Sequence, residues 1–199
     1  MSNSGGKVSY TYGNDLNGDG QVSNDLIFVP NRSTDLTFAP LTVGTGANAK
    51  TFTPEQQQAA FETYINGNSH LSERRGQYAE RNGGVFPWLT RFDLSVMQEV
   101  YINVGKNSKR NALQFRIDIL NFGNLISNKF GVGNQATASS GFSVNPLSLA
   151  SISADGTPSY RLATQVIDGS TELLRDSFVK SINLDNVWQA QLGVRYIFN

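Results

Sequence analysis

Four segments of the chain alternate between hydrophobic and polar residues, which is the pattern of β-strands with two chemically different faces. The alternation predicts strands at about 7–12, 88–101, 112–121 and 187–198. The last segment is the most regular, because its apolar positions run from Trp188 through Leu192 to Phe198 while Gln191 and Arg195 fall on the other face. The sequence therefore predicts an all-β fold.

Long polar connections separate these strands. Residues 13–87 and 122–186 are predicted as long loops, since turn-forming residues such as Gly, Asn and Ser recur through them. One short helix is expected within the first loop. Thr53 is suited to cap its start, Pro54 suits its first turn, and Gln56 completes the spacing of a capping box. This helix is expected over 54–66.

Two architectures share the alternation of these strands. In a soluble β-sandwich the apolar face packs inward, whereas in an outer-membrane barrel it meets lipid. Aromatic residues at both ends of the last strand favour the barrel, because about ten residue steps at about 3.3 Å, tilted by roughly 45°, span about 23 Å, close to the apolar band of such barrels. The order of long, short and long connections, and an aromatic residue just before the last position, also favour it.

We therefore predict an antiparallel transmembrane β-barrel segment with long extracellular loops and one short loop helix. Four strands cannot close a barrel, since the smallest closed barrels use about 8 strands. The chain is thus expected to be a fragment of a longer barrel or to share a barrel with other copies. The first 20 residues do not resemble a signal peptide, which favours the fragment.

The composition excludes several classes of function. Lys and Arg together number 16 and Asp and Glu 16, so the net charge is zero and we expect no nucleic-acid partner. Cysteine is absent and His70 is the only histidine, which excludes thiolate sites and metal sites built from several imidazoles. No run of about 18 apolar residues predicts a transmembrane helix.

Five motifs occur in an order that resembles a known family. They read YTYGNDLNGDGQVSNDLIFVP, FTPEQQQAAFETYI, RGQYAERNGGVFPWLTRFDLSV, FRIDILNFGNLIS and LGVRYIFN. Together they resemble the C-terminal barrel portion of TonB-dependent outer-membrane transporters, and in particular the Oar-like subgroup, whose members carry a carboxypeptidase-regulatory-like domain. The resemblance spans nearly the whole chain, with two departures: Asn199 follows Phe198, and the turn after 112–121 reads Asn121-Phe122-Gly123-Asn124.

This resemblance implies a function for the parent protein rather than for the chain alone. The parent would take up an unidentified ligand across the outer membrane, with energy from the TonB complex. This chain, residues 1–199, would supply the last strands of a barrel of about 22 strands. Its partners would be outer-membrane lipid and the remaining barrel and plug domain, its localisation the cell outer membrane, and no enzymatic activity is expected.

A calcium-type loop lies in the first long connection. Asp15, Asn17 and Asp19 followed by Gly20 have the spacing of calcium loops, in which oxygens at alternate positions converge on one ion. Gln21 would offer its carbonyl group, and Asp25 stands near the position of the usual glutamate, which is missing. The loop therefore predicts a weak Ca²⁺ site. The alternative is a loop of Asx turns without an ion.

Other polar groups carry weaker signals. Arg74, Arg75, Arg81 and Arg91 are candidates for meeting an anionic ligand, but pairing with Glu73, Glu80 and Asp93 is the favoured interpretation. Ser69 beside His70 does not have the geometry of a catalytic pair. The alternative function is a secreted calcium-stabilised β domain for adhesion or carbohydrate binding, and a glycosidase using Glu73 and Glu80 ranks third.

Overall fold

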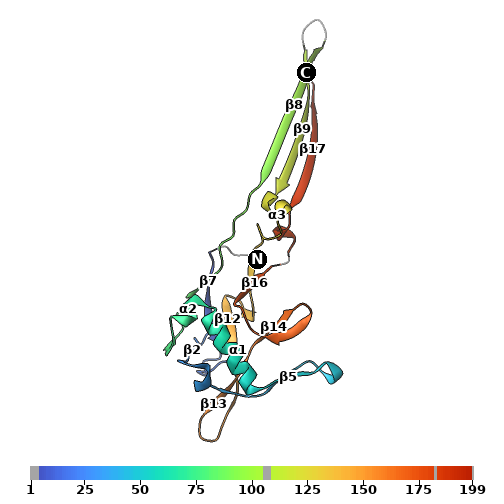
Figure 1. Ribbon diagram of the computed structural model, residues 1–199. Helices are drawn as coiled ribbons and strands as arrows, with labels where there is room; N and C mark the ends of the chain where they lie inside the picture. The colour runs from blue at the N-terminus through green and yellow to red at the C-terminus, as the bar shows by residue number, and fades with distance from the viewer. Residues whose placement is uncertain (1–4, 105–108, 182, 199) are drawn as a thin grey trace. The chain divides into compact units, whose positions relative to one another are not determined.

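The computed structural model describes residues 5–104, 109–181 and 183–198, and these form two compact units (Figure 1). Unit 1 contains the chain up to Pro87 together with Asn134–Val179. Unit 2 contains Trp88–Gly133 and the segment from Lys180 onward. Strands dominate the regular structure and the helices are few, so the predicted all-β class is confirmed.

Unit 1 is built from many short strands and two helices. Its strands are β1 (Lys7–Tyr12), β2 (Phe28–Val29), β3 (Thr37–Phe38), β4 (Leu41–Val43), β5 (Lys50–Phe52), β6 (Gln77–Tyr78), β7 (Gly84–Val85), β10 (Asn134–Ala136), β11 (Ser139–Ser140), β12 (Ser143–Ile152), β13 (Pro158–Leu162), β14 (Thr164–Ile167), β15 (Ser170–Leu173) and β16 (Phe178–Lys180), the last of which ends one residue inside unit 2. Its helices are α1 (Pro54–Asn66) and α2 (Ser69–Ser72), with 3-10 turns at Ser33–Asp35 and Gly46–Asn48.

The main sheet of unit 1 is mixed rather than antiparallel. Its strands follow the order β3-β13-β12-β1-β7, and β11 pairs with β12 at one end. β1 runs parallel to β12, and β13 runs parallel to β3. The prediction of purely antiparallel pairing is therefore wrong for this unit. Parallel pairs need long crossover connections, and the long segments between these strands supply them.

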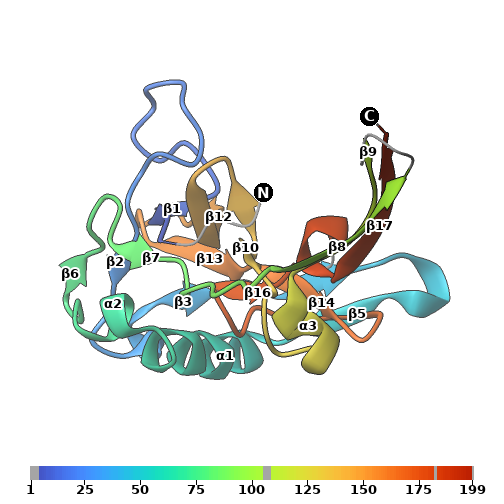
Figure 2. The ribbon, with the colours of Figure 1, turned by 90° about the horizontal axis from the view of Figure 1, so that it is seen from above.

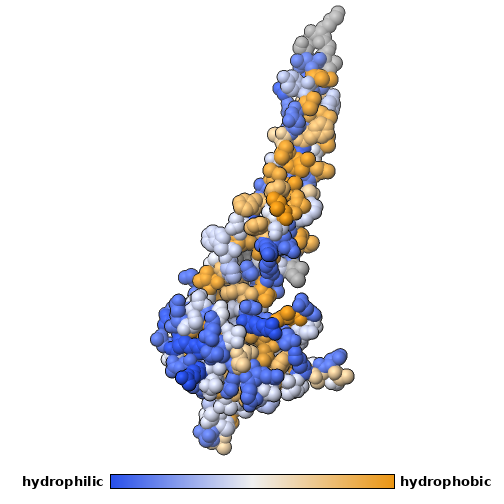
Figure 3. Space-filling model, viewed as in Figure 1, coloured by the Kyte–Doolittle hydropathy of each residue, from blue (hydrophilic) through white to orange (hydrophobic). Residues whose placement is uncertain are grey.

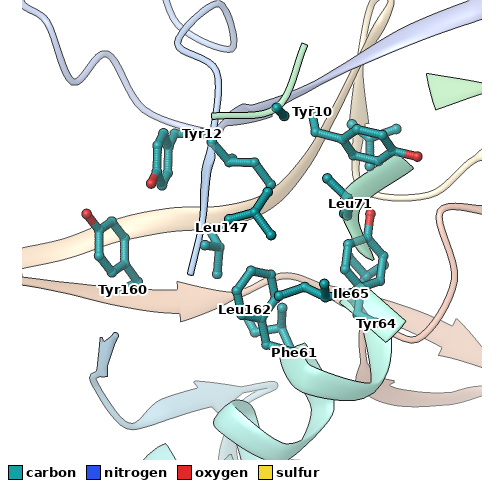
Figure 4. Packing of buried hydrophobic residues seen from close by; sticks show 14 of the residues in the cluster. Tyr10, Tyr12, Phe61, Tyr64, Ile65, Leu71, Leu147, Tyr160 and Leu162 are labelled. Atoms are coloured by element: carbon teal, nitrogen blue, oxygen red, sulfur yellow. The ribbon is translucent and has the colours of Figure 1, made fainter. Parts of the chain in front are cut away.

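Helix α1 begins and ends where the sequence predicts. The Thr53 side chain accepts from the backbone N–H of Gln56 at 3.3 Å, and the Gln56 side chain accepts from the N–H of Thr53 at 2.8 Å. This reciprocal capping box satisfies donors that a helix start otherwise leaves unpaired. The buried face of α1 carries Phe61, Tyr64 and Ile65, which pack into the core of unit 1 with residues of the main sheet (Figure 4).

β1 lies inside this core and is buried on both faces. Its apolar residues Val8 and Tyr10 are joined in the interior by Ser9 and Thr11. The two hydroxyl groups are hydrogen-bonded, since Ser9 accepts from the N–H of Asn82 at 2.9 Å and Thr11 donates to the Ser23 carbonyl group at 3.1 Å. The prediction that 7–12 is a fourth strand of the barrel wall is thus wrong, because neither face is free and the strand belongs to another sheet.

Unit 2 contains a separate sheet of three long antiparallel strands (Figure 1). They are β8 (Leu94–Val104), β9 (Lys109–Leu120) and β17 (Gln189–Ile197), with β9 in the centre. The predicted strand at 112–121 begins three residues earlier, and the one at 88–101 starts and ends later. The sequence also predicts a short basic turn with Lys106, Lys109 and Arg110; Lys106 lies outside the described residues, and the other two belong to β9.

The two predicted long loops are largely structured. Among the described residues, the range 13–87 contains six strands of unit 1 in addition to the helices, and the range 122–186 contains seven. These strands have two to ten residues, and most have five or fewer. Periodicity cannot identify the shortest of these strands, because a window of two or three residues contains no measurable period.

A helix and two buried asparagines organise the base of the unit 2 sheet. α3 (Phe122–Ile126) follows β9 directly, and Asn121 before it adopts a left-handed backbone with φ 53°. The Asn121 side chain donates to the carbonyl groups of Gly131 and Asn186 at 3.0 and 3.2 Å. Asn186 in turn accepts from the N–H of Gly133 at 3.0 Å. These bonds hold the segments flanking the sheet together.

Candidate functional site

The sheet of unit 2 has one apolar face. Register places Val96, Ile117 and Leu192 side by side in one row across the three strands. The side chains of this face are largely exposed, and Leu192 reaches 75%. The exposed apolar members of the face are Leu94, Val96, Val100, Ile102, Leu113, Phe115, Ile117, Leu192, Val194 and Tyr196. Hydrophobic residues accordingly gather over these strands in Figure 3.

The opposite face is predominantly polar. Asp118 lies opposite both Ser95 and Gln191. Its carboxylate accepts from the Ser95 hydroxyl group at 2.6 Å and forms an ion pair with Arg116 at 2.7 Å. Farther along the sheet, Arg110 pairs with Glu99 on the neighbouring strand. Charged side chains on this face are therefore paired with one another.

Both edges of this sheet lack a neighbouring strand among the described residues. β9 pairs on each side, whereas β8 and β17 each pair on one side only. Their outer backbone N–H and C=O groups therefore have no ladder partner in the part of the chain that the structure describes. Such edges are templates for pairing with additional strands.

The calcium-type loop connects β1 to β2 and projects from unit 1 on the side opposite α1 (Figure 2). The Asp15 carboxylate accepts from the backbone N–H groups of Gly18 at 2.7 Å and Gly20 at 2.8 Å. The Asn17 side chain accepts from the N–H of Asp19 at 2.9 Å. Asp25 is also drawn into the loop, because its carboxylate accepts from the N–H of Leu16 at 2.7 Å.

Among the carboxylates of this loop, that of Asp19 accepts the most hydrogen bonds. It accepts from the backbone N–H of Gln21 at 2.7 Å and from the side chains of Asn24 and Asn17. These bonds, chiefly the one from Gln21, lower the pKa of Asp19 below its ordinary value. The Gln21 side chain lies exposed. The loop thus has the hydrogen bonding of Asx turns. Among the predicted ligands, Asp15, Asn17, Asp19 and Asp25 accept these hydrogen bonds with their side chains, and Gln21 donates one from its backbone.

The side-chain atoms of this loop are of the type that binds a hard cation. All its side-chain acceptors are oxygens, and the side-chain oxygen of Asn24 is buried without a hydrogen-bond partner in the described chain. Across the described ranges, however, no three Asp, Glu, His or Cys side chains form a group suited to hold a metal ion. The carboxylates accept hydrogen bonds from backbone N–H groups and do not converge on one point.

A cleft of about 720 Å³ lies beside this loop in unit 1. Asn17, Asp19, Asn24 and Asp25 line it from the loop, and Arg81 lines it from the segment after β6. Four aromatic residues complete the lining: Tyr12, Phe28, Tyr78 and Tyr160. Sequence reasoning singled out the loop and Arg81 but missed the aromatic residues, which come from separate strands far apart in the chain.

The arginine cluster of the sequence is divided among different partners. Arg74 pairs with Glu80, as predicted, whereas Arg75 pairs with Glu62 of α1 instead of with Glu73. Arg91 donates to the Asn186 side chain at 2.9 Å in unit 2. Arg81 has no hydrogen bond or ion pair with another residue that the structure describes. It is therefore the member of this group that remains available to a ligand.

His70 is held in a structural setting. Its ring stacks on Tyr10 with centroids 5.9 Å apart, and its Nε2 accepts from the backbone N–H of Glu80 at 3.2 Å. Burial lowers the pKa of His70. A ring nitrogen committed to a backbone donor is poorly placed to take a proton from Ser69.

Comparisons with models of known protein families, with curated proteins and with solved structures give no match. Within the described residues, no helix has the length and apolar character needed to cross a membrane.

Proposed function

We propose that β8, β9 and β17 form part of the wall of an outer-membrane β-barrel. In this proposal the chain is the C-terminal part of a TonB-dependent transporter of the Oar-like subgroup that takes up a ligand across the outer membrane. The observation that carries the proposal is the exposed apolar face of the unit 2 sheet, backed by a polar face with paired charges. This is the arrangement that a barrel wall needs between lipid and lumen.

The energetics of the apolar face support a lipid environment. Removing a Val, Leu, Ile or Phe side chain from water stabilises a protein by about 1.5–3 kcal/mol. Leu192, Val194 and Tyr196 are each at least 60% exposed, so most of this free energy is unrealised in water. A lipid contact would realise it without any further protein packing.

Strand length and sheet edges support the same proposal. β8 has 11 residues, β9 has 12 and β17 has 9, close to the roughly 9–11 residues that cross a bilayer. The open edges of β8 and β17 cannot face lipid unpaired. We therefore propose that neighbouring strands of the parent barrel pair with them, and that the plug domain and the TonB complex act through that parent.

Spin labels on the last strand test this orientation. In the full-length protein reconstituted into liposomes, a nitroxide at position 192 should be relaxed by oxygen and shielded from a polar relaxation agent, because it would face hydrocarbon. A nitroxide at the adjacent position 191 is the matched control and should show the reverse. Equal exposure of both labels to the polar agent would contradict the proposed wall.

A secreted calcium-stabilised β domain is the alternative function. It requires the apolar face of unit 2 to be covered by protein in water. Sedimentation of the chain without detergent separates the two: a monodisperse monomer with a cooperative thermal transition favours the secreted domain, and association that detergent reverses favours the barrel wall.

For the loop from Asp15 to Asp25 we propose weak Ca²⁺ binding. Its oxygen-rich composition and the unpartnered side-chain oxygen of Asn24 support this proposal. Calorimetric titration should give a calcium heat in the wild type that disappears in Asp19→Ala and persists in Asp155→Ala, an exposed aspartate of another turn in unit 1. Equal heats in the two variants would contradict the site.

A further inference from the structure

The cleft beside the 13–26 loop has the size of a small-molecule site. Its volume of about 720 Å³ falls within the roughly 300–1,000 Å³ typical of ligand pockets. It lies entirely within unit 1, since every lining residue belongs to that unit. Ligand binding in this cleft therefore does not depend on the proposed membrane role of unit 2.

Tyr78 presents an exposed aromatic ring in this cleft. The short strands β2 and β6 place Phe28 directly opposite Tyr78, and the two rings meet edge to face with centroids 5.4 Å apart. Tyr78 nevertheless remains 63% exposed. A ring that is held by a neighbour and still open to solvent is a preorganised platform for a flat apolar surface.

Two buried tyrosines form a rigid part of the lining. Tyr12 and Tyr160 stack with centroids 5.5 Å apart, and both lie at the edge of the core shown in Figure 4. The Tyr12 hydroxyl group accepts from the backbone N–H of Phe28 at 3.3 Å. Burial raises the pKa of Tyr12, so this hydroxyl group stays neutral near pH 7.

The polar lining offers both donors and acceptors. Arg81 supplies N–H donors that no described residue occupies. The carboxylates of Asp19 and Asp25 already accept backbone N–H groups, which fixes their positions and leaves further lone pairs for a ligand. A ligand whose groups both donate and accept would satisfy this lining most completely.

The charge of the lining restricts the ligand further. In the Ca²⁺-free chain, one arginine against two aspartates gives the lining a formal charge of −1, which disfavours phosphates, carboxylates and other anions. A simple amine would donate to the aspartates and leave Arg81 unpaired. Hydroxyl groups serve both partners without carrying charge, and a pyranose ring has an apolar C–H face that stacks on aromatic rings.

We propose that this cleft binds a neutral saccharide. One face of a pyranose ring lies on Tyr78, and its hydroxyl groups bond to Arg81 and to the carboxylates of Asp19 and Asp25. The inference goes beyond the proposed membrane function and holds whether or not the unit 2 sheet meets lipid.

Saturation-transfer NMR on the full chain tests the proposal. The chain is kept in a zwitterionic detergent without a sugar head group, and the probes are the methyl glycosides of glucose, galactose, mannose and N-acetylglucosamine, with glucuronate as the anionic comparison. At least one neutral glycoside should receive saturation, most strongly at the ring protons of one face. Its apparent affinity should fall about tenfold or more in Tyr78→Ala and in Arg81→Ala.

Matched variants separate binding from general damage. Phe142→Ala removes an aromatic ring that is 78% exposed elsewhere on unit 1, and Arg161→Ala removes an exposed arginine outside the cleft. Both should bind as the wild type does, and Tyr78→Trp should retain binding because it keeps an aromatic platform. Failure of all four neutral glycosides, stronger binding of glucuronate, or unchanged affinity in Tyr78→Ala would overturn the proposal.

Discussion

Gln57 is the buried polar residue whose replacement tests the core of unit 1 most sharply. It lies on α1 with no exposed surface. Its side-chain amide donates to the carbonyl group of Ala39 at 2.7 Å, and its side-chain oxygen accepts from the N–H of Leu162 on β13 at 3.0 Å. One side chain thus links the helix to two backbone segments that are distant in the sequence.

Gln57→Leu should destabilise unit 1 because it keeps the volume and removes both bonds. Each buried backbone group left without a partner costs about 1–3 kcal/mol. The Leu162 N–H and the Ala39 carbonyl group together give about 2–6 kcal/mol. The added apolar side chain offsets part of this cost, by about 1 kcal/mol. We expect a net loss of about 1–5 kcal/mol in the free energy of unfolding.

Hydrogen–deuterium exchange of unit 1 peptides measures this change locally. Peptides covering α1 and β13 should exchange at least tenfold faster in Gln57→Leu than in the wild type. The control is Gln58→Leu, which removes one bond from a partly exposed side chain to the Leu36 carbonyl group and should cost at most about 1 kcal/mol. Equal protection in the two variants would refute the assigned role of Gln57.

Two further predictions concern charge and packing in unit 1. Arg75 donates to the Glu62 carboxylate and lowers the pKa of Glu62 to about 2. Because this pKa is depressed in the folded state, the pair stabilises the protein above about pH 4.5, and that contribution is lost as the pH falls toward 2. An acid titration followed by circular dichroism should therefore be flatter over that window in Glu62→Gln, and an unchanged profile would contradict the coupling. Gly84→Ala should destabilise the folded protein by about 1–3 kcal/mol, because its new Cβ would lie 2.7 Å from the Val8 side chain and 2.8 Å from the Tyr10 side chain. The control is Gly13→Ala, whose new Cβ would have its nearest contact at an ordinary 3.7 Å and should cause no such loss in a thermal melt. Equal melting temperatures of the two variants would show that the core rearranges to accept the added methyl group.

Local sequence signals were sufficient for the long strands and for α1. The alternation at 112–121 and 187–198 predicts β9 and β17 within a few residues, because each strand is long enough to show its period and has different environments on its two faces. Helix α1 is predicted at both ends, and its start is marked by the capping box of Thr53 and Gln56, which acts within four residues. The oxygen-rich loop after β1 is likewise visible in the sequence.

Only the tertiary structure decided which strands belong together. β1 alternates as well as β17 does over its length, yet it pairs in parallel with β12 and is buried on both faces. The aromatic cleft is equally invisible in the sequence, because Tyr12, Tyr78 and Tyr160 come from separate strands. Periodicity records which side chains of one strand share a face, but the partner of that face is chosen by contacts between segments far apart in the chain, and no local pattern carries that information.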